Sequence, residues 1–285
     1  MQKSEQYSVL KLYFDFRALG GWNALTDSIK LFEEAGNVNF TCLVPDLSGG
    51  IDPDDAFSSV PYEKGFNTLY YLEKLVGGPA VFEPFLRSYI EKFAHQSITT
   101  EDWKAYVIEY FSSTPAKAAI DAVNWETIMG PGMPAWDPQF NTTLADTALN
   151  LAAHWIGGGT DCAESDIAGW NTDQFCLFLD KLYNDSTVLS IEVLNTMGDA
   201  YNFSSSRNSE VCFRWYKLNI QAENEAILDS AVRFVTSIGR MKFVRPLYRE
   251  LFKMRPQLAI DTFKEHESFY NPICHKMTSG DLGLN

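Results

Sequence analysis

The stretch VPYEKGFNTLYYLEKLVGGP, residues 60–79, decides the fold class, because it contains one complete helix with both of its ends. Pro61 stands at the expected start of the helix, where a backbone N–H would have no partner within the helix, so proline is tolerated there. Glu63 follows in the first turn. The run Gly77-Gly78-Pro79 then ends the helix. A broad inner face is predicted from the helical spacing of Phe66, Leu69, Tyr70, Leu72 and Leu75. We therefore predict a helix over Val60–Val76 that packs on several sides.

The flanking segments continue the helical pattern. AVFEPFLRSYIEKF, residues 80–93, has the helical period, although Pro84 must lie in its first turn or kink it. SITTEDWKAYVIEYF, residues 97–111, begins with threonines followed by Glu101 and Asp102, which is typical of a capped helix start. Strand signals are few. NVNFTCLVPDL, residues 37–47, is the best candidate for extended structure.

Three prolines and two glycines divide the chain in the run GPGMPAWDP, residues 130–138, which cannot continue a helix. Beyond it, seven amphipathic segments follow one another between residues 142 and 270, each about one helix long, with short turns between them. Such a series predicts paired helices stacked into a layer or solenoid, although no fixed repeat period is present. We predict a mainly α chain with a lobe at 1–130, a proline-rich linker at 131–140 and a helical domain at 141–285.

Composition excludes several classes of function. The 285 residues are 46% hydrophobic, enough for a packed core, and carry a formal net charge of −14, which argues against nucleic acid or an anionic membrane as the main partner. No window approaches the roughly 18 unbroken apolar residues of a membrane span, and the N-terminus lacks the pattern of a secretory signal. Five cysteines without CxxC spacing predict reduced thiols. We therefore expect a cytoplasmic protein.

A metal-binding motif is missing from the sequence. The pair His266-Glu267 begins like the metalloprotease signature H-E-x-x-H, but position 270 is tyrosine, so the second ligand is absent. Nucleophile elbows, Walker loops and Rossmann glycine patterns are absent as well. We expect no cofactor to be held by this chain.

The first candidate site lies just before and within the helix at Val60–Val76. Asp52, Asp54 and Asp55 form an acidic turn, and Tyr62 follows close to the helix start. A tyrosine there can donate its phenolic hydrogen to an oxyanion, because the positive end of the helix dipole favours the developing charge. The alternative is ordinary helix capping by the acids and packing by the tyrosine.

The second candidate site is GRMKFVRPL, residues 239–247, where Arg240, Lys242 and Arg245 gather three cations in an acidic chain. Arg240 and Lys242 alternate as they would on an extended or turn segment, and together they could bind a carboxylate. The alternative is a salt-bridged helix start.

Four collinear stretches carry a resemblance to a known family: IDPDDAFSSVPYEKGF (51–66), SITTEDWKAYV (97–107), SEVCFRWYKL (209–218) and GRMKFVRPL (239–247). They closely resemble the C-terminal half of the zinc metallopeptidase family that contains leukotriene A4 hydrolase and aminopeptidase B, from about Phe16 to the end of the chain. The resemblance implies part of a thermolysin-like helical lobe, then a C-terminal α-helical superhelix of HEAT or armadillo type. A substrate cleft is expected between them.

The resemblance also implies roles for particular residues. Tyr62 corresponds to the proton donor or oxyanion stabiliser of peptide hydrolysis, and Asp54 to a carboxylate that directs water in epoxide hydrolysis. Arg240 and Lys242 correspond to the groups that bind the substrate's carboxylate. Pro53 and Ala56 are expected to contact substrate.

Two departures from the family pattern put lipid-epoxide chemistry in doubt. Phe57 stands where leukotriene A4 hydrolase has a tyrosine, and SGGIDPD contains an extra glycine. The family's zinc-binding H-E-x-x-H helix, its further glutamate ligand and its glycine-rich exopeptidase motif have no counterpart in the sequence. Zinc and a peptide substrate are therefore expected of the full-length family, and this chain alone is expected to be inactive.

Three interpretations of the chain remain open. It is the C-terminal portion of a zinc aminopeptidase, an enzyme half that needs a separate N-terminal chain, or a helical scaffold and interaction module. We favour the first, because a scaffold has no physical need for Tyr62, Asp54, Arg240 and Lys242 together. A tripeptide spans about 10 Å when extended, so the Tyr62 hydroxyl and the Arg240 guanidinium are expected to lie on the order of that distance apart.

Overall fold

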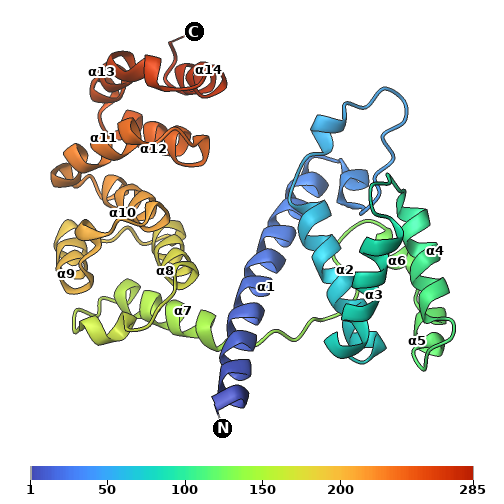
Figure 1. Cartoon of the computed structure of the whole chain (residues 1–285). Coiled ribbons are helices and arrows are strands. Elements are labelled where there is room, and N and C mark those ends of the chain that lie inside the picture. Colours follow the sequence, from blue (N-terminus) through green and yellow to red (C-terminus); the bar gives the residue numbers. More distant parts are fainter. Residues whose placement is uncertain (1, 285) are drawn as a thin grey trace. The chain divides into compact units, whose positions relative to one another are not determined.

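The computed structural model describes the backbone of residues 2–284 and the side chains of residues 10–284. The described residues form helices and no strand, which confirms the predicted mainly α class (Figure 1). The chain divides into two compact units, Met1–Thr142 and Thr143–Asn285. Each unit has its own hydrophobic core and is described by itself.

The first unit contains six α-helices and two short 3-10 helices within the described residues. They are α1 (Gln2–Glu34), η1 (Val38–Thr41), η2 (Pro53–Ala56), α2 (Val60–Val76), α3 (Pro79–Lys92), α4 (Thr100–Phe111), α5 (Lys117–Asp121) and α6 (Trp125–Met129).

Helix α2 has the predicted bounds. Gly77 ends it in a left-handed conformation, with φ 110°, that glycine adopts without steric cost. Its buried face differs in part from the predicted one. Leu69 is 37% exposed, whereas Val60 and Lys64 are buried, because the face between them packs toward α1 and the loops beside it.

Helix α1 was not predicted, because its apolar residues are spread around the helix instead of forming one face. It packs along α2 (Figure 1). Leu25 and Ile29 of α1 form a small core with Val60 at the start of α2. This contact fixes the start of α2 on a long, regular support.

The larger core of the first unit joins α2 to α3, α4 and α5. Phe85 and Phe111 are fully buried in it, and Pro84 lies inside α3. Helix α4 begins with a capping box, as its sequence predicts. The Thr99 side chain accepts from the Asp102 N–H, and Asp102 accepts from the Thr99 N–H at 2.8 Å.

The prediction of extended structure at residues 37–47 is wrong. Val38–Thr41 forms a 3-10 helix, and an irregular loop follows. The physical reason is that a strand needs a partner strand, and the described residues offer none. The carbonyl of Thr41 accepts a hydrogen bond from Lys64, and its hydroxyl accepts one from the Gly132 N–H.

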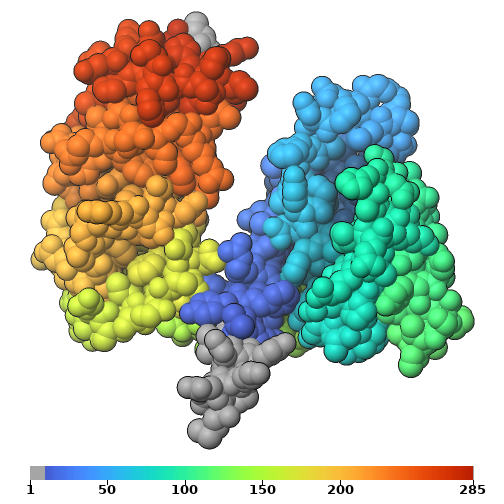
Figure 2. Space-filling view, in the orientation of Figure 1, coloured from blue at the N-terminus to red at the C-terminus, as the bar shows by residue number. Residues whose placement is uncertain are grey.

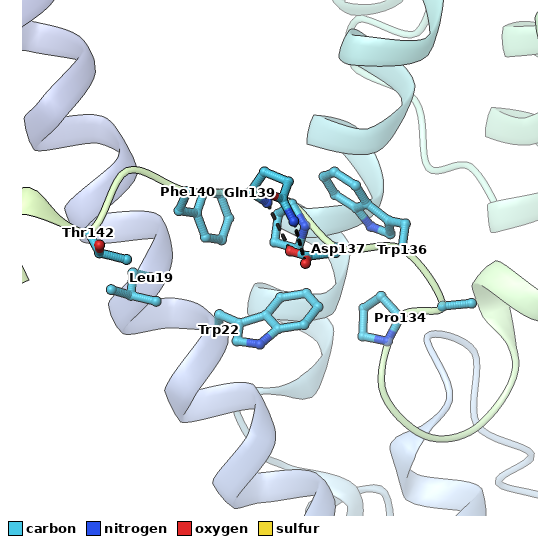
Figure 3. A pocket seen from close by; sticks show the side chains of 10 residues that line it. Leu19, Trp22, Pro134, Trp136, Asp137, Gln139, Phe140 and Thr142 are labelled. Atoms are coloured by element: carbon cyan, nitrogen blue, oxygen red, sulfur yellow. Dashed lines mark hydrogen bonds between the residues drawn. The ribbon is translucent and has the colours of Figure 1, made fainter.

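The proline-rich segment after Gly130 packs into the first unit. The Trp136 ring contacts the rings of Tyr70 and Tyr71, at 5.7 and 5.3 Å between centroids. Residues 134–140 also line a cavity of about 580 Å³ with Leu19 and Trp22 of α1 (Figure 3). The predicted linker is therefore ordered, and the division between units falls after Thr142.

The second unit contains eight α-helices and four 3-10 helices within the described residues. They are α7 (Thr143–Ile156), η3 (Glu164–Ile167), α8 (Thr172–Asn184), α9 (Ile191–Tyr201), η4 (Phe203–Ser205), α10 (Ser209–Gln221), η5 (Glu225–Ile227), α11 (Leu228–Ser237), α12 (Met241–Met254), α13 (Pro256–His266), η6 (Glu267–Phe269) and α14 (Pro272–Asp281). Each of the seven predicted amphipathic segments of this region overlaps one of the helices α7 to α13, and α14 was not predicted.

These helices stack in chain order, from α7 to α14 (Figure 2, green-yellow to red). Two cores fill the stack. Phe178 of α8 and Trp215 of α10 belong to the first, and Phe213 of α10 and Tyr248 of α12 belong to the second. Helix α10 contributes to both cores, so it joins the two halves of the unit. No helix among the described residues is long and apolar enough to cross a membrane.

Candidate functional site

The start of α2 is held by two serines that precede it. The Ser59 hydroxyl donates to the Ala24 carbonyl of α1 at 3.1 Å and shares a hydrogen bond with the Ser28 hydroxyl at 2.7 Å. The Ser58 hydroxyl accepts from the Val60 N–H at 3.1 Å. The sequence Ser-Ser-Val-Pro therefore fixes where the helix begins and how it is rotated on α1.

This orientation of α2 places the Tyr62 side chain on the solvent-exposed face of the helix. Val60 and Lys64 are four residues apart and lie on one buried face, and a residue midway between them projects to roughly the opposite side of the helix. Tyr62 is accordingly 66% exposed, and its hydroxyl has no hydrogen-bond partner among the described residues. Its phenol is free to donate to a ligand.

Lys64 is the residue that sequence reasoning missed. It is only 1% exposed, and its ammonium donates to three backbone carbonyls: Thr41 at 2.9 Å, Gly130 at 2.5 Å and Gly132 at 2.7 Å. Burial lowers the pKa of Lys64 to about 8. One side chain thus ties α2 to η1 and to the proline-rich segment, on the side of the helix away from Tyr62.

Two grooves meet at Tyr62. The larger, of about 640 Å³, is mainly apolar and is lined by α2, α3, α4 and the loop after η1, with Leu69, Leu86 and Trp103 among its residues. The smaller, of about 320 Å³, lies against α1 and includes Phe14 and Glu63. A ligand in either groove would lie beside Tyr62.

Asp54 lies in the 3-10 helix η2, eight residues before Tyr62. The Asp52 side chain caps this turn by accepting from the Asp54 N–H at 3.0 Å. The carboxylate of Asp54 is exposed and has no partner within the described chain. Pro53 is exposed and Ala56 is half-buried in the same turn, and Phe57 is 76% exposed. No hydrogen bond joins Asp54 to Tyr62, so the structure places them in one unit without linking them.

The predicted basic residues lie in the second unit. The sequence predicted an extended or turn segment for Arg240 and Lys242, and the backbone is extended at Arg240 but helical at Lys242. Arg240 is the N-cap of α12, and Lys242 lies in its first turn. Helix α12 runs from Met241 through Pro246 to Met254, and Phe243, Val244 and Leu247 on it are buried. Arg245 forms a bidentate pair with Asp281, at 2.7 and 2.9 Å.

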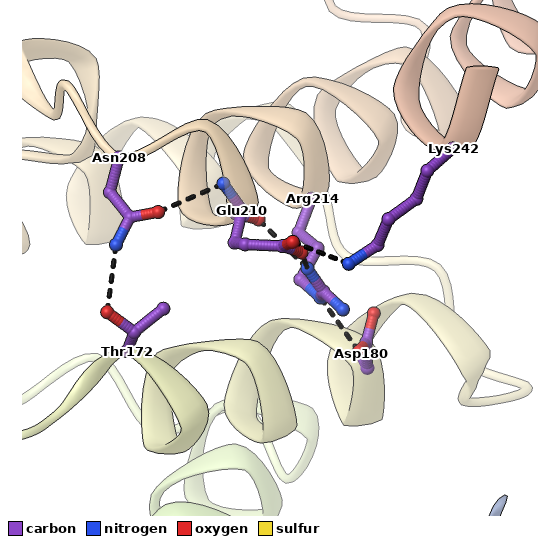
Figure 4. A network of polar contacts seen from close by, with 6 residues as sticks. All are labelled: Thr172, Asp180, Asn208, Glu210, Arg214 and Lys242. Atoms are coloured by element: carbon purple, nitrogen blue, oxygen red, sulfur yellow. Dashed lines mark hydrogen bonds and ion pairs between the residues drawn. The ribbon is translucent and has the colours of Figure 1, made fainter. Parts of the chain in front are cut away.

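Lys242 ends a chain of ion pairs that begins on α8 (Figure 4). Its ammonium lies 2.5 Å from Glu210 Oε1, and Glu210 Oε2 lies 2.7 Å from Arg214 Nη1. Arg214 Nε lies 2.8 Å from Asp180 Oδ2. Burial raises the pKa of Glu210, but hydrogen bonds from Lys242 and Arg214 outweigh it and lower the pKa overall. Lys242 is therefore already partnered.

Arg240 is different from its neighbours. It is exposed, forms no ion pair within the described residues, and lies 5.8 Å from the centre of the Phe243 ring. A carboxylate ligand could bind its free guanidinium. Its distance from Tyr62 stays a prediction.

The described residues contain no group of three or more His, Cys, Asp and Glu side chains that could hold a metal ion. His266 shares a hydrogen bond with the Thr262 carbonyl at 3.0 Å, and His275 lies 3.4 Å from Glu267. The side chains that the structure describes therefore do not fit a zinc site.

Two family models match the chain. "Peptidase family M1 domain" matches residues 34–125, and "Leukotriene A4 hydrolase, C-terminal" matches residues 170–282. The structure of native leukotriene A4 hydrolase from Saccharomyces cerevisiae superposes with a TM-score of 0.87 and 36% identity, over 96% of this chain and 46% of that one. This chain belongs to the leukotriene A4 hydrolase family.

Curated relatives agree with the assignment. The leukotriene A-4 hydrolase homolog of Botryotinia fuckeliana is 39% identical over 95% of this chain and 41% of its own length. Leucine aminopeptidase 2 of Aspergillus clavatus is 40% identical over 95% of this chain and 44% of its own length. The chain thus spans less than half the length of these leukotriene A4 hydrolase relatives.

Proposed function

We propose that the chain is the C-terminal portion of a zinc metallo-aminopeptidase of the leukotriene A4 hydrolase family and is inactive alone. The observation that carries the proposal is the exposed, unpartnered hydroxyl of Tyr62, held at a fixed helix start between two grooves. Tyr62 would donate its hydrogen to the oxygen that becomes negative when a peptide carbonyl is attacked. Arg240 would bind a carboxylate of the substrate, and Lys242 would contribute by its charge.

In this proposal the zinc is held by residues that are not part of this chain, because the described residues do not form a metal site. Asp54 has the exposure that a water-directing carboxylate needs, but Phe57 carries no hydroxyl. We therefore favour peptides over lipid epoxides as substrates. A cytoplasmic location is part of the same proposal.

A second candidate is an enzyme half that works with a separate N-terminal chain. The apolar groove beside Tyr62 favours it over a pure scaffold. Leu69 and Leu86 are each 37% exposed there, and exposed apolar surface of this kind commonly marks a surface that another polypeptide covers.

The test is reconstitution. The purified chain is assayed with leucine p-nitroanilide alone and after mixing with the N-terminal part of Aspergillus clavatus leucine aminopeptidase 2. We expect no hydrolysis by the chain alone and measurable hydrolysis by the mixture. Tyr62→Phe should lower kcat by about 10²–10³-fold, the usual loss on removing one oxyanion donor.

Tyr71→Phe is the matched control, because Tyr71 lies on the same helix and packs against Trp136. It should leave the rate of the mixture unchanged. Hydrolysis by the chain alone, together with about one tightly bound zinc by elemental analysis, would overturn the proposal.

A further inference from the structure

The second unit contains a polar pocket of about 470 Å³ that plays no part in the proposed function. It lies between the loop before α10, the helix α10 itself and α11. Of its 11 lining residues, five are serines and two are arginines, Arg207 and Arg233, and none is acidic. Such a lining is unusual in a chain with a net charge of −14.

The two arginines lack carboxylate partners. Among the described residues neither guanidinium forms an ion pair, and Arg233 donates only to the Ser230 hydroxyl, at 2.9 Å. The acid nearest in sequence to Arg207 is Glu210, and its two oxygens are already bound to Lys242 and Arg214 (Figure 4). The positive charge of the pocket is therefore not neutralised from within.

Hydroxyl donors complete the lining. The hydroxyls of Ser204 and Ser209 have no hydrogen-bond partner in the part of the chain that the structure describes. Tyr216 lines the pocket as well; burial raises the pKa of its hydroxyl, and the charge of Arg233 opposes that rise. Phe234 and Ile238 add apolar wall beside these donors.

We propose that this pocket binds a phosphate monoester of small-metabolite size. Two guanidinium groups offer paired N–H donors that match the oxygens of a phosphate, and serine hydroxyls add single donors. The volume lies within the range of small-molecule pockets, roughly 300–1,000 Å³, so the apolar wall has room for the organic part of the ester. A nucleic acid is not the ligand, because the net charge of the chain repels its backbone.

The test titrates the full chain with phenyl phosphate by isothermal calorimetry, with benzoate and inorganic phosphate as comparison ligands. We expect phenyl phosphate to bind about tenfold more tightly than either, since benzoate offers fewer acceptor oxygens and inorganic phosphate lacks the ring. Binding should strengthen from pH 5.5 to 7.5, as the monoester gains its second charge near a pKa of about 6.

The variants Arg207→Gln and Arg233→Gln should each weaken the binding of phenyl phosphate by about tenfold. Arg87→Gln is the control, because it removes the same charge from an exposed pair with Glu83 in the first unit, and it should leave the affinity unchanged. Thermal melting of every variant checks that it is folded.

Three results would overturn the proposal. If benzoate binds as tightly as phenyl phosphate, the pocket is a general anion site. If inorganic phosphate binds as tightly, the pocket does not recognise the organic part of an ester. Affinity that survives both arginine substitutions in a folded protein would place the ligand elsewhere.

Discussion

At the start of α2 in the first unit, Tyr62 and Asp54 are exposed and have no hydrogen-bond partners within the described chain. At the start of α12 in the second unit, Lys242 is already bound to Glu210, and Arg245 to Asp281. The first unit also exposes an apolar groove, whereas the second fills its stack with two continuous cores. The difference teaches that the first unit presents groups for a ligand or another polypeptide, whereas Lys242 and Arg245 of the second unit are bound within their own stack.

The largest expected effect tests whether the two units are separate cooperative bodies. Phe85 in the first unit and Phe178 in the second are both fully buried. Phe85→Ala and Phe178→Ala should each lower the free energy of unfolding by about 4 kcal/mol, because each removes buried apolar surface and leaves a cavity. Native-state hydrogen exchange should show the loss only in the unit that carries the substitution.

Phe57→Ala is the control, because Phe57 is 76% exposed, and its effect should be within about 0.5 kcal/mol. If both core variants lower protection equally throughout the chain, the two units unfold as one body and the comparison between them fails.

Helices α2 and α4 could be predicted from the sequence because their ends carry local signals. Proline and glycine mark α2, and threonine with aspartate marks α4, through contacts within a few residues. The 3-10 helix at Val38–Thr41 could not be predicted, since the partners of Thr41 are Lys64 and Gly132, which are far away in the sequence. The local sequence of residues 38–41 carries no information about contacts with such distant residues.

The candidate site was only partly accessible to sequence reasoning. Tyr62 and Arg240 could be named as candidates from residue type and position, but their roles came from the resemblance to the family. Lys64 gave no signal, because a lysine within a helix is usually solvated. Its position four residues after Val60 marks it as buried only once the structure shows that this face of α2 packs toward α1.

A smaller effect tests whether Lys64 supports the site in the first unit. Lys64→Met should destabilise that unit by about 3 kcal/mol, because three carbonyls lose a buried ammonium donor. Native-state hydrogen exchange at the amides of the first unit measures it. Lys30→Met, at an exposed position on α1, should change the free energy by less than about 0.5 kcal/mol.

The same lysine predicts a pH dependence. The folded-state pKa of Lys64 is lowered to about 8, so between pH 8 and 10.5 the unfolded chain binds more protons at this site than the folded one. The contribution of Lys64 to stability therefore rises as the pH rises through this window. The stability difference between wild type and Lys64→Met should grow from pH 7.5 to 9.5, and a constant difference would contradict the assigned pKa.

The smallest effect concerns the ion pairs of the second unit. Asp281 accepts a bidentate pair from Arg245, and Arg249 lies 3.6 Å away. Asp281→Asn should cost about 1 kcal/mol at pH 7, the upper end for ion pairs near a surface. Asp199→Asn is the control, because Asp199 is exposed and has no partner among the described residues.

Acid titration then separates this ion pair from simple packing. The hydrogen bond from Arg245 holds the pKa of Asp281 below its usual 3.8. A carboxylate whose folded pKa is lowered stabilises the fold above its unfolded pKa and loses that contribution as the pH falls through the folded value. The difference between wild type and Asp281→Asn should therefore shrink below pH 3.8. If it persists in acid, where the carboxylate is protonated, Asp281 acts through shape and not charge, and the second unit is not stabilised by its own ion pairs as the comparison requires.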